Sequence, residues 1–283
     1  MLSKNQKILI VGLGLMGGSF AEGLSNNGYY VGALSEKKED IDYALQKGII
    51  SSGEYEIKPE YIAKFDIVIF ALYPHIFINW MKENQQYLKP HAIISDVTGV
   101  KKEVVNPVNS FIRKDLIYIP IHPMAGKEVY GVVNADKNIF KGANFIIVNN
   151  DNKDDDVQKI KDIANLLEFK NIVMLSVDEH DEMIGFLSQL THCIAVSLMT
   201  CKESENLALY TGDSFRDLTR IAKINENMWC ELFLMNKEKL LEQMELFSKE
   251  FNKIKEAIKL DDKETIKEMM KTSTKRRGYF DKK

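Results

Sequence analysis

The stretch YIPIHPMAGKE, residues 118–128, places a histidine where it could carry out acid–base chemistry. His122 follows the apolar residues 117–121, which have the composition of a buried strand, and it lies between Pro120 and Pro123. Proline restricts its own backbone dihedral angles and those of the preceding residue, so the backbone that carries the imidazole has little conformational freedom. A histidine, with an ordinary pKa of about 6.5, can accept a proton from a hydroxyl group while hydride leaves the adjacent carbon. A lone histidine is more often structural, so this interpretation depends on the surrounding elements.

A glycine-rich turn near the N-terminus has the spacing that binds a dinucleotide. Residues 7–11 have the composition of a buried strand, and Gly12, Gly14 and Gly17 follow in the pattern GxGxxG before helix-like residues. The first glycine permits the tight turn, the second lets the backbone approach a pyrophosphate, and the third lets the helix pack closely on the strand. Free N–H groups at the start of the helix then face the phosphates. The predicted cofactor-binding residues are Gly12, Gly14, Leu15, Met16, Gly17, Ser35, Glu36 and Leu72.

The end of the second predicted strand contains opposing signals for NAD and NADP. An acidic residue there accepts hydrogen bonds from the ribose hydroxyls of NAD, whereas a nearby basic residue accommodates the 2′-phosphate of NADP. Ser35 occupies the expected position of the acid, Glu36 follows it, and Lys37 and Lys38 come next. The choice stays open, with a slight preference for NADP, and no metal is expected.

Short apolar segments alternate with helix-like segments through the first half of the chain. Continuous apolar strands that alternate with helices predict a parallel sheet with helices on both faces. Ligands of such a sheet bind beyond the carboxyl ends of its strands, where His122 and Leu72 are expected. The predicted fold class is therefore α/β, with a Rossmann-type dinucleotide-binding domain at 1–176. Its strands are predicted at 7–11, 29–34, 65–72, 92–97, 116–121, 144–150 and 171–176, the last completing the sheet.

The second half of the chain has helical periodicity. One apolar-faced helix is predicted over 180–207, and another over 225–260, a stretch of 36 residues without proline or glycine. Helices this long and this apolar need a partner surface. We therefore expect an all-α substrate and dimerisation domain at 177–283 and a homodimer through its helices.

Composition excludes several classes of protein. The chain has 283 residues, enough for two domains, and its net charge of −3 offers no general attraction to nucleic acid or anionic lipid. Three cysteines without a CxxC pair are typical of reduced thiols in the cytoplasm. The apolar N-terminal stretch is short and broken by glycine, and no segment approaches 18 uninterrupted apolar residues. Neither a signal peptide nor a membrane span is expected.

Taken together, the motifs resemble those of the prephenate dehydrogenase family. The resemblance extends from about residue 7 to 240, through VGLGLMGGSFA, SDVTGVK, YIPIHPMAGKE, HDEMIGFLSQLTH and SFRDLTRIAKINENMWCELFLMNK. It implies a Rossmann domain followed by a helical dimerisation domain. It also implies oxidation of prephenate by NAD(P)+, in which hydride leaves the ring carbon that carries the hydroxyl, CO2 departs and 4-hydroxyphenylpyruvate forms.

The resemblance assigns roles to individual residues. His122 matches the histidine that hydrogen-bonds the substrate hydroxyl, and Arg220 matches an arginine that binds a substrate carboxylate in the bidentate manner open to arginine. Arg216, four residues earlier, offers a second cation on the same helical face; without the resemblance, salt bridges from this pair to Asp213 or Asp217 would be the favoured explanation. The remaining implied residues are the catalytic His192 and the substrate-binding Glu128, Ser188, Gln189 and Trp229.

Two positions depart from the family pattern. Where many members have D-x-G-S-x-K, this chain reads DVTGVK, so Gly99 holds the serine position and Thr98 the glycine position. Thr98 is expected to supply the missing hydroxyl from one residue earlier. Where many members have S-H-L-P-H, this chain has SQLTH, and Gln189 can form hydrogen bonds but cannot carry a proton.

Three other functions compete with this one. Arogenate dehydrogenase uses the same chemistry on the aminated substrate, and nothing in the residues separates the two. A beta-hydroxyacid dehydrogenase shares the GLGxMG opening but uses a lysine that the segment 180–203 lacks at the required spacing. A dinucleotide sensor without catalytic activity would have no reason to keep His122, Arg220 and His192. The chain is expected to be monofunctional, without a regulatory ACT or chorismate mutase domain.

Overall fold

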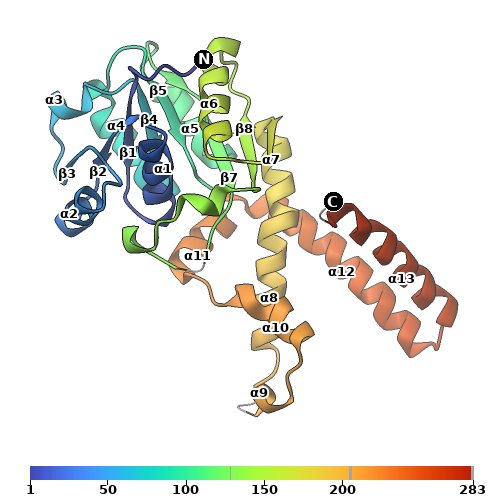
Figure 1. Cartoon of the computed structure of the whole chain (residues 1–283). Helices are drawn as coiled ribbons and strands as arrows, with labels where there is room; N and C mark the ends of the chain where they lie inside the picture. The colour runs from blue at the N-terminus through green and yellow to red at the C-terminus, as the bar shows by residue number, and fades with distance from the viewer. Residues whose placement is uncertain (128, 204–205, 282–283) are drawn as a thin grey trace.

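The computed structural model describes residues 1–127, 129–203 and 206–281. Its N-terminal part contains a six-stranded parallel sheet in the order β3-β2-β1-β4-β5-β6, which confirms the α/β class (Figure 1). The strands are β1 Lys7–Val11, β2 Tyr30–Leu34, β3 Ser52–Glu54, β4 Ile67–Phe70, β5 Ile93–Asp96 and β6 Ile117–Tyr118. The helices are α1 Leu15–Asn26, α2 Lys38–Gln46, α3 Pro59–Ile62, α4 Pro74–Asn84, α5 Lys102–Phe111 and α6 Asp154–Leu166. Short 3-10 turns occupy Gln85–Tyr87, Val132–Asn134 and Lys137–Phe140.

The central strands are buried on both faces. Because successive side chains of a strand point to opposite faces, Ile8 and Ile10 of β1 face one core while Leu9 and Val11 face the other. The first core includes residues of α1, α2 and α6, and the second includes residues of α4 and α5. This explains why these strands are continuous apolar runs in the sequence.

The predicted strand 116–121 is divided between two sheets. Ile119 still donates its N–H to Ile94 O of the first sheet at 2.8 Å, whereas Pro120 O accepts from Val148 N at 2.9 Å. Proline has no N–H to continue a ladder, so the chain changes sheets at this residue. The second sheet has the order β7-β8-β9, with β7 antiparallel to β8 and β8 parallel to β9. These strands are β7 Ile121–Met124, β8 Asn144–Val148 and β9 Asn171–Leu175.

This arrangement corrects the prediction for two strands. The segments 144–150 and 171–176 do not belong to the parallel sheet, because β8 pairs with β7 and β9 pairs with β8 in the second sheet. His122 therefore lies on β7, immediately after the change of sheets, and is not at the free end of a strand of the first sheet.

The remaining chain is helical, as predicted. The helix expected over 180–207 starts at Val177, contains a π-helical segment at Gly185–Gln189 and ends at Thr200. A capping box explains the earlier start, since Ser176 and Glu179 bond each other's backbone N–H groups. The elements are α7 Val177–Ile184, α8 Leu190–Thr200, α9 Leu207–Tyr210, α10 Asp213–Thr219, α11 Glu226–Met235, α12 Lys237–Lys259 and α13 Lys263–Arg277, with 3-10 turns at Arg220–Ala222 and Gly278–Phe280.

The helix predicted over 225–260 is interrupted at Asn236. This buried residue leaves the helical conformation, and its side-chain Nδ2 donates to Asp181 O at 2.9 Å and to Gln189 Oε1 at 2.7 Å. These bonds join the start of α12 to α7 and to the π-helical segment. Gly185 of that segment lies against α12, since a side-chain carbon there would be in ordinary van der Waals contact, at 3.5 Å, with the backbone of Lys239.

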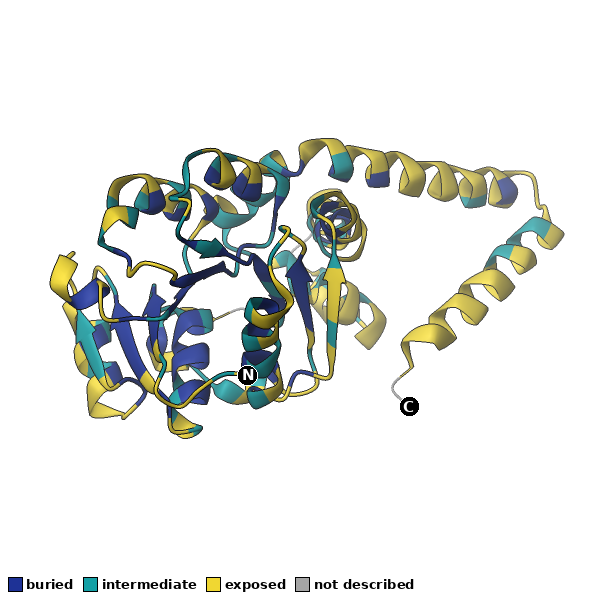
Figure 2. Ribbon diagram, turned by 90° about the horizontal axis from the view of Figure 1, so that it is seen from above, coloured by how far each residue is buried: buried dark blue, intermediate teal, exposed yellow. Residues whose placement is uncertain are grey.

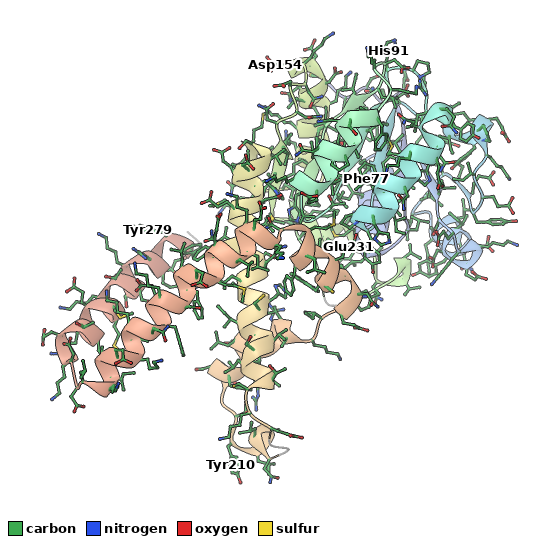
Figure 3. All side chains as sticks on the ribbon, turned by 180° about the vertical axis from the view of Figure 1, so that it is seen from behind. Phe77, His91, Asp154, Tyr210, Glu231 and Tyr279 are labelled. Atoms are coloured by element: carbon green, nitrogen blue, oxygen red, sulfur yellow. The ribbon has the colours of Figure 1, made fainter. Side chains whose placement is uncertain are left out.

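The two parts of the chain also meet through α11. Figure 3 shows Glu231 of this helix against the Rossmann part, and its carboxylate lies 2.8 Å from His75 Nδ1 at the start of α4. In contrast, α12 and α13 form a pair that extends away from the rest of the molecule (Figure 1), and most of their surface is exposed (Figure 2). Large apolar side chains on this surface include Leu241, Met244, Leu246, Phe247, Phe251, Ile258, Leu260 and Met270.

The continuous helix Val177–Thr200 is long and apolar enough, by length and composition alone, to cross a membrane. Its first turns, however, contain the buried His180 and Asp181, whose side chains bond each other and whose carboxylate bonds α5. A helix of a folded core meets the same length and composition test. We therefore interpret it as the central helix of the second domain.

Asn236→Ala is predicted to destabilise the protein by about 1–3 kcal/mol, because Gln189 Oε1 and Asp181 O would lose a buried donor. The free energy of unfolding measured in urea tests this. Asn227→Ala, an exposed change on the neighbouring α11, is the control and should stay within about 0.5 kcal/mol of the parent. Equal stability of the two variants would contradict the linking role of Asn236.

Candidate active site

His122 lies at the centre of a network of polar side chains. Its Nδ1 lies 2.9 Å from Nε2 of His180, in the second turn of α7, and the two rings are tilted by 52°. Burial, the neighbouring His180 and the charge of Lys101 lower the pKa of His122 well below the ordinary value. The imidazole is therefore neutral at physiological pH, which is the form that can accept a proton.

Asp181 connects His180 to the Rossmann part. Its Oδ1 lies 2.7 Å from Nδ1 of His180 and also accepts the N–H of Lys101 at 2.9 Å, while its Oδ2 accepts the N–H of Lys102 at 2.8 Å. The last two groups are the first N–H groups of α5, which no side chain of its own N-cap residue satisfies. A carboxylate from α7 thus caps a helix of the other domain, where the helix dipole favours negative charge.

Lys101 bonds the backbone of the residue that precedes His122. Its ammonium group is fully buried and donates to Asp96 Oδ1 at 2.6 Å and to Ile121 O at 2.7 Å. Burial lowers the pKa of Lys101, and the charge of Asp96 opposes that effect. Tyr118 donates its hydroxyl to the other oxygen of Asp96 at 2.7 Å. The backbone just before His122 is therefore bonded to a paired ion in the core.

Thr98 is part of this network in a way that the sequence did not predict. Its hydroxyl donates to Asp96 Oδ1 and lies 3.0 Å from Val100 O, and its N–H donates to Asp96 as well. These bonds hold the loop after β5, so the contacts of Thr98 give no support to the expected catalytic hydroxyl. Gly99 is the position that faces the histidine, since a side-chain carbon there would lie 3.9 Å from His122 Cε1.

The other predicted histidine, His192, lies on α8. Its ring stacks on Trp229 of α11, with ring centroids 3.7 Å apart, and its Nδ1 donates to Ser188 O at 2.9 Å. Gln189 is not on a pocket surface: it is buried, its Nε2 donates to Leu232 O at 2.8 Å, and its Oε1 accepts from Asn236. These contacts join helices and give no support to the substrate-binding role expected for Gln189.

Both predicted arginines are exposed. Arg216 lies on α10, where its guanidinium is 3.4 Å from Asp213 Oδ1 and 3.4 Å from Thr211 O, so part of the alternative pairing does form. Arg220 begins the 3-10 turn that packs against α8, the helix of His192. The change from α-helix to 3-10 turn means that the two arginines do not share a regular helical face. Glu128 lies outside the described residues.

The glycine turn has the shape that a dinucleotide requires. Gly12 has a positive φ of 96°, and a side-chain carbon there would lie 2.6 Å from Ala71 O. A carbon at Gly17 would lie 1.9 Å from Gly12 O, so the helix could not pack as it does. At Gly14, by contrast, no described atom lies within 4 Å of that position, which leaves room for a pyrophosphate.

Other predicted cofactor residues surround this turn. Leu72 follows β4, and its Cδ2 would lie 2.8 Å from a side-chain carbon placed at Gly12. Ser35 and the exposed Glu36 follow β2 at the same edge of the sheet. Leu15 and Met16 open α1, whose N-terminus is not capped by any described side chain. These residues fit NAD(P), with the pyrophosphate against the N-terminus of α1.

Sequence reasoning missed His180, Asp181 and Lys101. The sequence does contain a signal for the first two, because the capping box at Ser176 and Glu179 predicts a helix start that places them in its first turns. Nothing in the sequence pairs them with His122, which lies 58 residues away from His180.

Comparisons with known proteins agree with this geometry. Residues 20–175 match the model of the prephenate dehydrogenase nucleotide-binding domain, and residues 176–272 match that of its dimerization domain. The chain is 31% identical over 278 residues to a prephenate dehydrogenase of Lactococcus lactis subsp. cremoris, covering 95% of this chain and 76% of the relative. It is 28% identical over 275 residues to a prephenate dehydrogenase of Bacillus subtilis, covering 94% and 74%.

A solved structure is also similar over nearly the whole chain. Prephenate dehydrogenase from A. aeolicus, in complex with hydroxyphenyl propionate and NAD+, superposes with a TM-score of 0.88 at 29% identity and covers 98% of each chain. Both halves of this chain thus match one family in the same order, and the chain belongs to the prephenate dehydrogenase family.

Proposed function

We propose that this chain catalyses the NAD(P)-dependent oxidative decarboxylation of prephenate to 4-hydroxyphenylpyruvate. The observation that carries the proposal is His122, whose Nδ1 lies 2.9 Å from His180 Nε2, in a chain whose glycine turn fits a dinucleotide. The bound cofactor supplies the hydride acceptor. Arogenate dehydrogenase activity, which needs the same groups, is the alternative that the experiment below distinguishes.

The proposed role of His122 follows from proton balance. As hydride leaves the ring carbon, the hydroxyl on that carbon becomes acidic, and the imidazole accepts its proton. Loss of CO2 then makes the ring aromatic and leaves a phenolate oxygen, to which His122 can return the proton. A base with a lowered pKa suits this cycle because it starts neutral and releases the proton readily.

Arginine side chains are the proposed partners of the substrate carboxylates. Prephenate has two carboxylates, and the guanidinium fork bonds a carboxylate through two parallel hydrogen bonds. Arg220 lies next to the helix of His192, and the 3.4 Å contact of Arg216 with the exposed Asp213 is weak enough to be exchanged. His192, stacked on Trp229, is proposed to contact the substrate between these groups and His122.

A homodimer is proposed through the helical domain. The apolar side chains of α12 and α13 face solvent, and so does a hollow of about 540 Å³ beside the edge strand β9, which Val173, Met183 and Leu187 help to line. Exposed apolar surface of this kind, next to a free strand edge, is typical of an interface. We place the enzyme in the cytoplasm, as its three cysteines, all free, suggest.

Sedimentation velocity is predicted to give about twice the chain mass of 32.5 kDa. Phe251→Glu should shift the protein toward monomer, because it places a charge among the apolar side chains of α12. Lys253→Gln, an exposed change on the opposite side of the same helix, is the control and should leave the dimer intact. A monomeric parent protein would contradict the proposed assembly.

The reaction itself is tested by initial rates of reduced-cofactor formation, with prephenate and arogenate each combined with NAD+ and NADP+. The expected result is turnover of prephenate with a modest preference for NADP+. Ser35→Asp should move the preference toward NAD+ by about tenfold or more, since a carboxylate accepts from ribose hydroxyls and repels a 2′-phosphate. Turnover of arogenate alone would replace the proposed substrate, and no turnover in any combination would refute the function.

His122→Asn is predicted to lower kcat by at least about a hundredfold while cofactor affinity is unchanged, because the imidazole acts in the transition state. For the parent, kcat/KM should fall on the acid side only below about pH 6.5, since a base with a lowered pKa stays neutral to lower pH. An acid limb at or above that pH, or unchanged turnover in the variant, would contradict the role of His122.

A further inference from the structure

The contacts of His122 bear on which of its two ring nitrogens carries the hydrogen. A neutral imidazole carries one hydrogen, on either Nδ1 or Nε2, and only the nitrogen without it can accept a proton from substrate. The Nδ1 of His122 faces His180, so Nε2 is the nitrogen left for the substrate. We propose that His180 and Asp181 are positioning residues that hold the hydrogen of His122 on Nδ1 and so keep Nε2 ready to accept the substrate proton.

Asp181 determines which group donates in each hydrogen bond of this network. Its two oxygens accept the backbone N–H groups of Lys101 and Lys102, which can only donate. An ionised carboxylate is acceptor-only, so the group facing it from His180 must be Nδ1–H. The Asp181 carboxylate therefore fixes the hydrogen of His180 on Nδ1.

The tautomer of His180 in turn determines the tautomer of His122. Burial and the charge of Lys101 lower the pKa of His180, and these effects keep its ring neutral although Asp181 acts in the opposite sense. A neutral His180 with hydrogen on Nδ1 has a lone pair on Nε2, which must accept from Nδ1–H of His122. The opposite order would require a doubly protonated, buried His180 close to the ammonium group of Lys101.

The network also holds His122 in place while it is charged. Once Nε2 has accepted a proton, the imidazolium keeps its Nδ1–H bond to His180, and Asp181 lies at the far end of the chain of bonds. Lys101 acts against this charge, but its own ammonium is paired with Asp96. The charged groups around the histidine pair are thus Lys101 and Asp96 from the Rossmann part and Asp181 from α7.

Two substitutions at His180 separate this role from simple packing. Phenylalanine fills a similar volume but cannot accept the hydrogen of His122. Glutamine has no ring, but its Oε1 can accept from His122 and its Nε2 can donate to Asp181. Its amide cannot carry a proton. A positioning role therefore predicts opposite outcomes for the two variants.

His180→Phe is expected to lower kcat by about a hundredfold or more, as in other sites where a histidine base is left in the wrong tautomer, with KM for prephenate within about threefold. His180→Gln should retain kcat to within about tenfold. His91→Asn, at the far end of the Rossmann part (Figure 3), is the control and should keep parent activity. Parent-like kcat in His180→Phe, or equal losses in two folded variants, would overturn the proposal.

Because these rates rest on the proposed function, a second measurement is made without substrate. Nitrogen-15 spectra of the histidine rings in the intact enzyme report which nitrogen of His122 carries the hydrogen. We expect hydrogen on Nδ1 in the parent and in His180→Gln. Hydrogen on Nε2 in the parent would overturn the proposal even if prephenate is turned over, whereas hydrogen on Nδ1 would support it even if another substrate is used.

Discussion

The carboxylate of Asp181 is the interaction on which the rest of the site depends. This carboxylate caps α5 of the Rossmann part by accepting two backbone N–H groups, and it bonds the ring of His180. The backbone carbonyl of Asp181 accepts from Asn236 at the start of α12. One residue thus joins a helix of each domain and the histidine pair. Since all three attachments are buried, a shift of α7 relative to α5 would change the position of His180 directly.

A buried ammonium group usually destabilises a protein unless it is paired and bonded. Lys101 meets these conditions, because Asp96 carries the opposite charge and Ile121 O accepts a further bond. Tyr118 bonds the second oxygen of Asp96, and burial together with that carboxylate raises the pKa of Tyr118, so it remains a donor. The ion pair therefore holds the backbone beside His122, while Asp181 controls the ring from the other side.

The sequence was sufficient for the parts of the fold that depend on local pattern. The glycine turn, the alternation of strands and helices, and the helical second half follow from periodicity and spacing, and the structure agrees. The sequence shows Pro120 within the predicted strand, but it does not show that the chain changes sheets there, because the pairing partners of a strand are not encoded locally. The break at Asn236 was missed for a similar reason: asparagine is permitted in a helix, and only its distant partners Asp181 and Gln189 explain the interruption.

The two departures from the family pattern acquire different meanings in the structure. Gln189 uses both ends of its amide to join α11 and Asn236, which is a structural use of the side chain. Gly99 faces His122 and offers no hydroxyl, whereas the hydroxyl of Thr98 is directed to Asp96. In the proposed mechanism, the orientation of the His122 base therefore depends on His180 rather than on a neighbouring hydroxyl. In that mechanism, the base is controlled from α7, the helix that follows the second sheet, and the loop after β5 contributes the Lys101–Asp96 ion pair beside it.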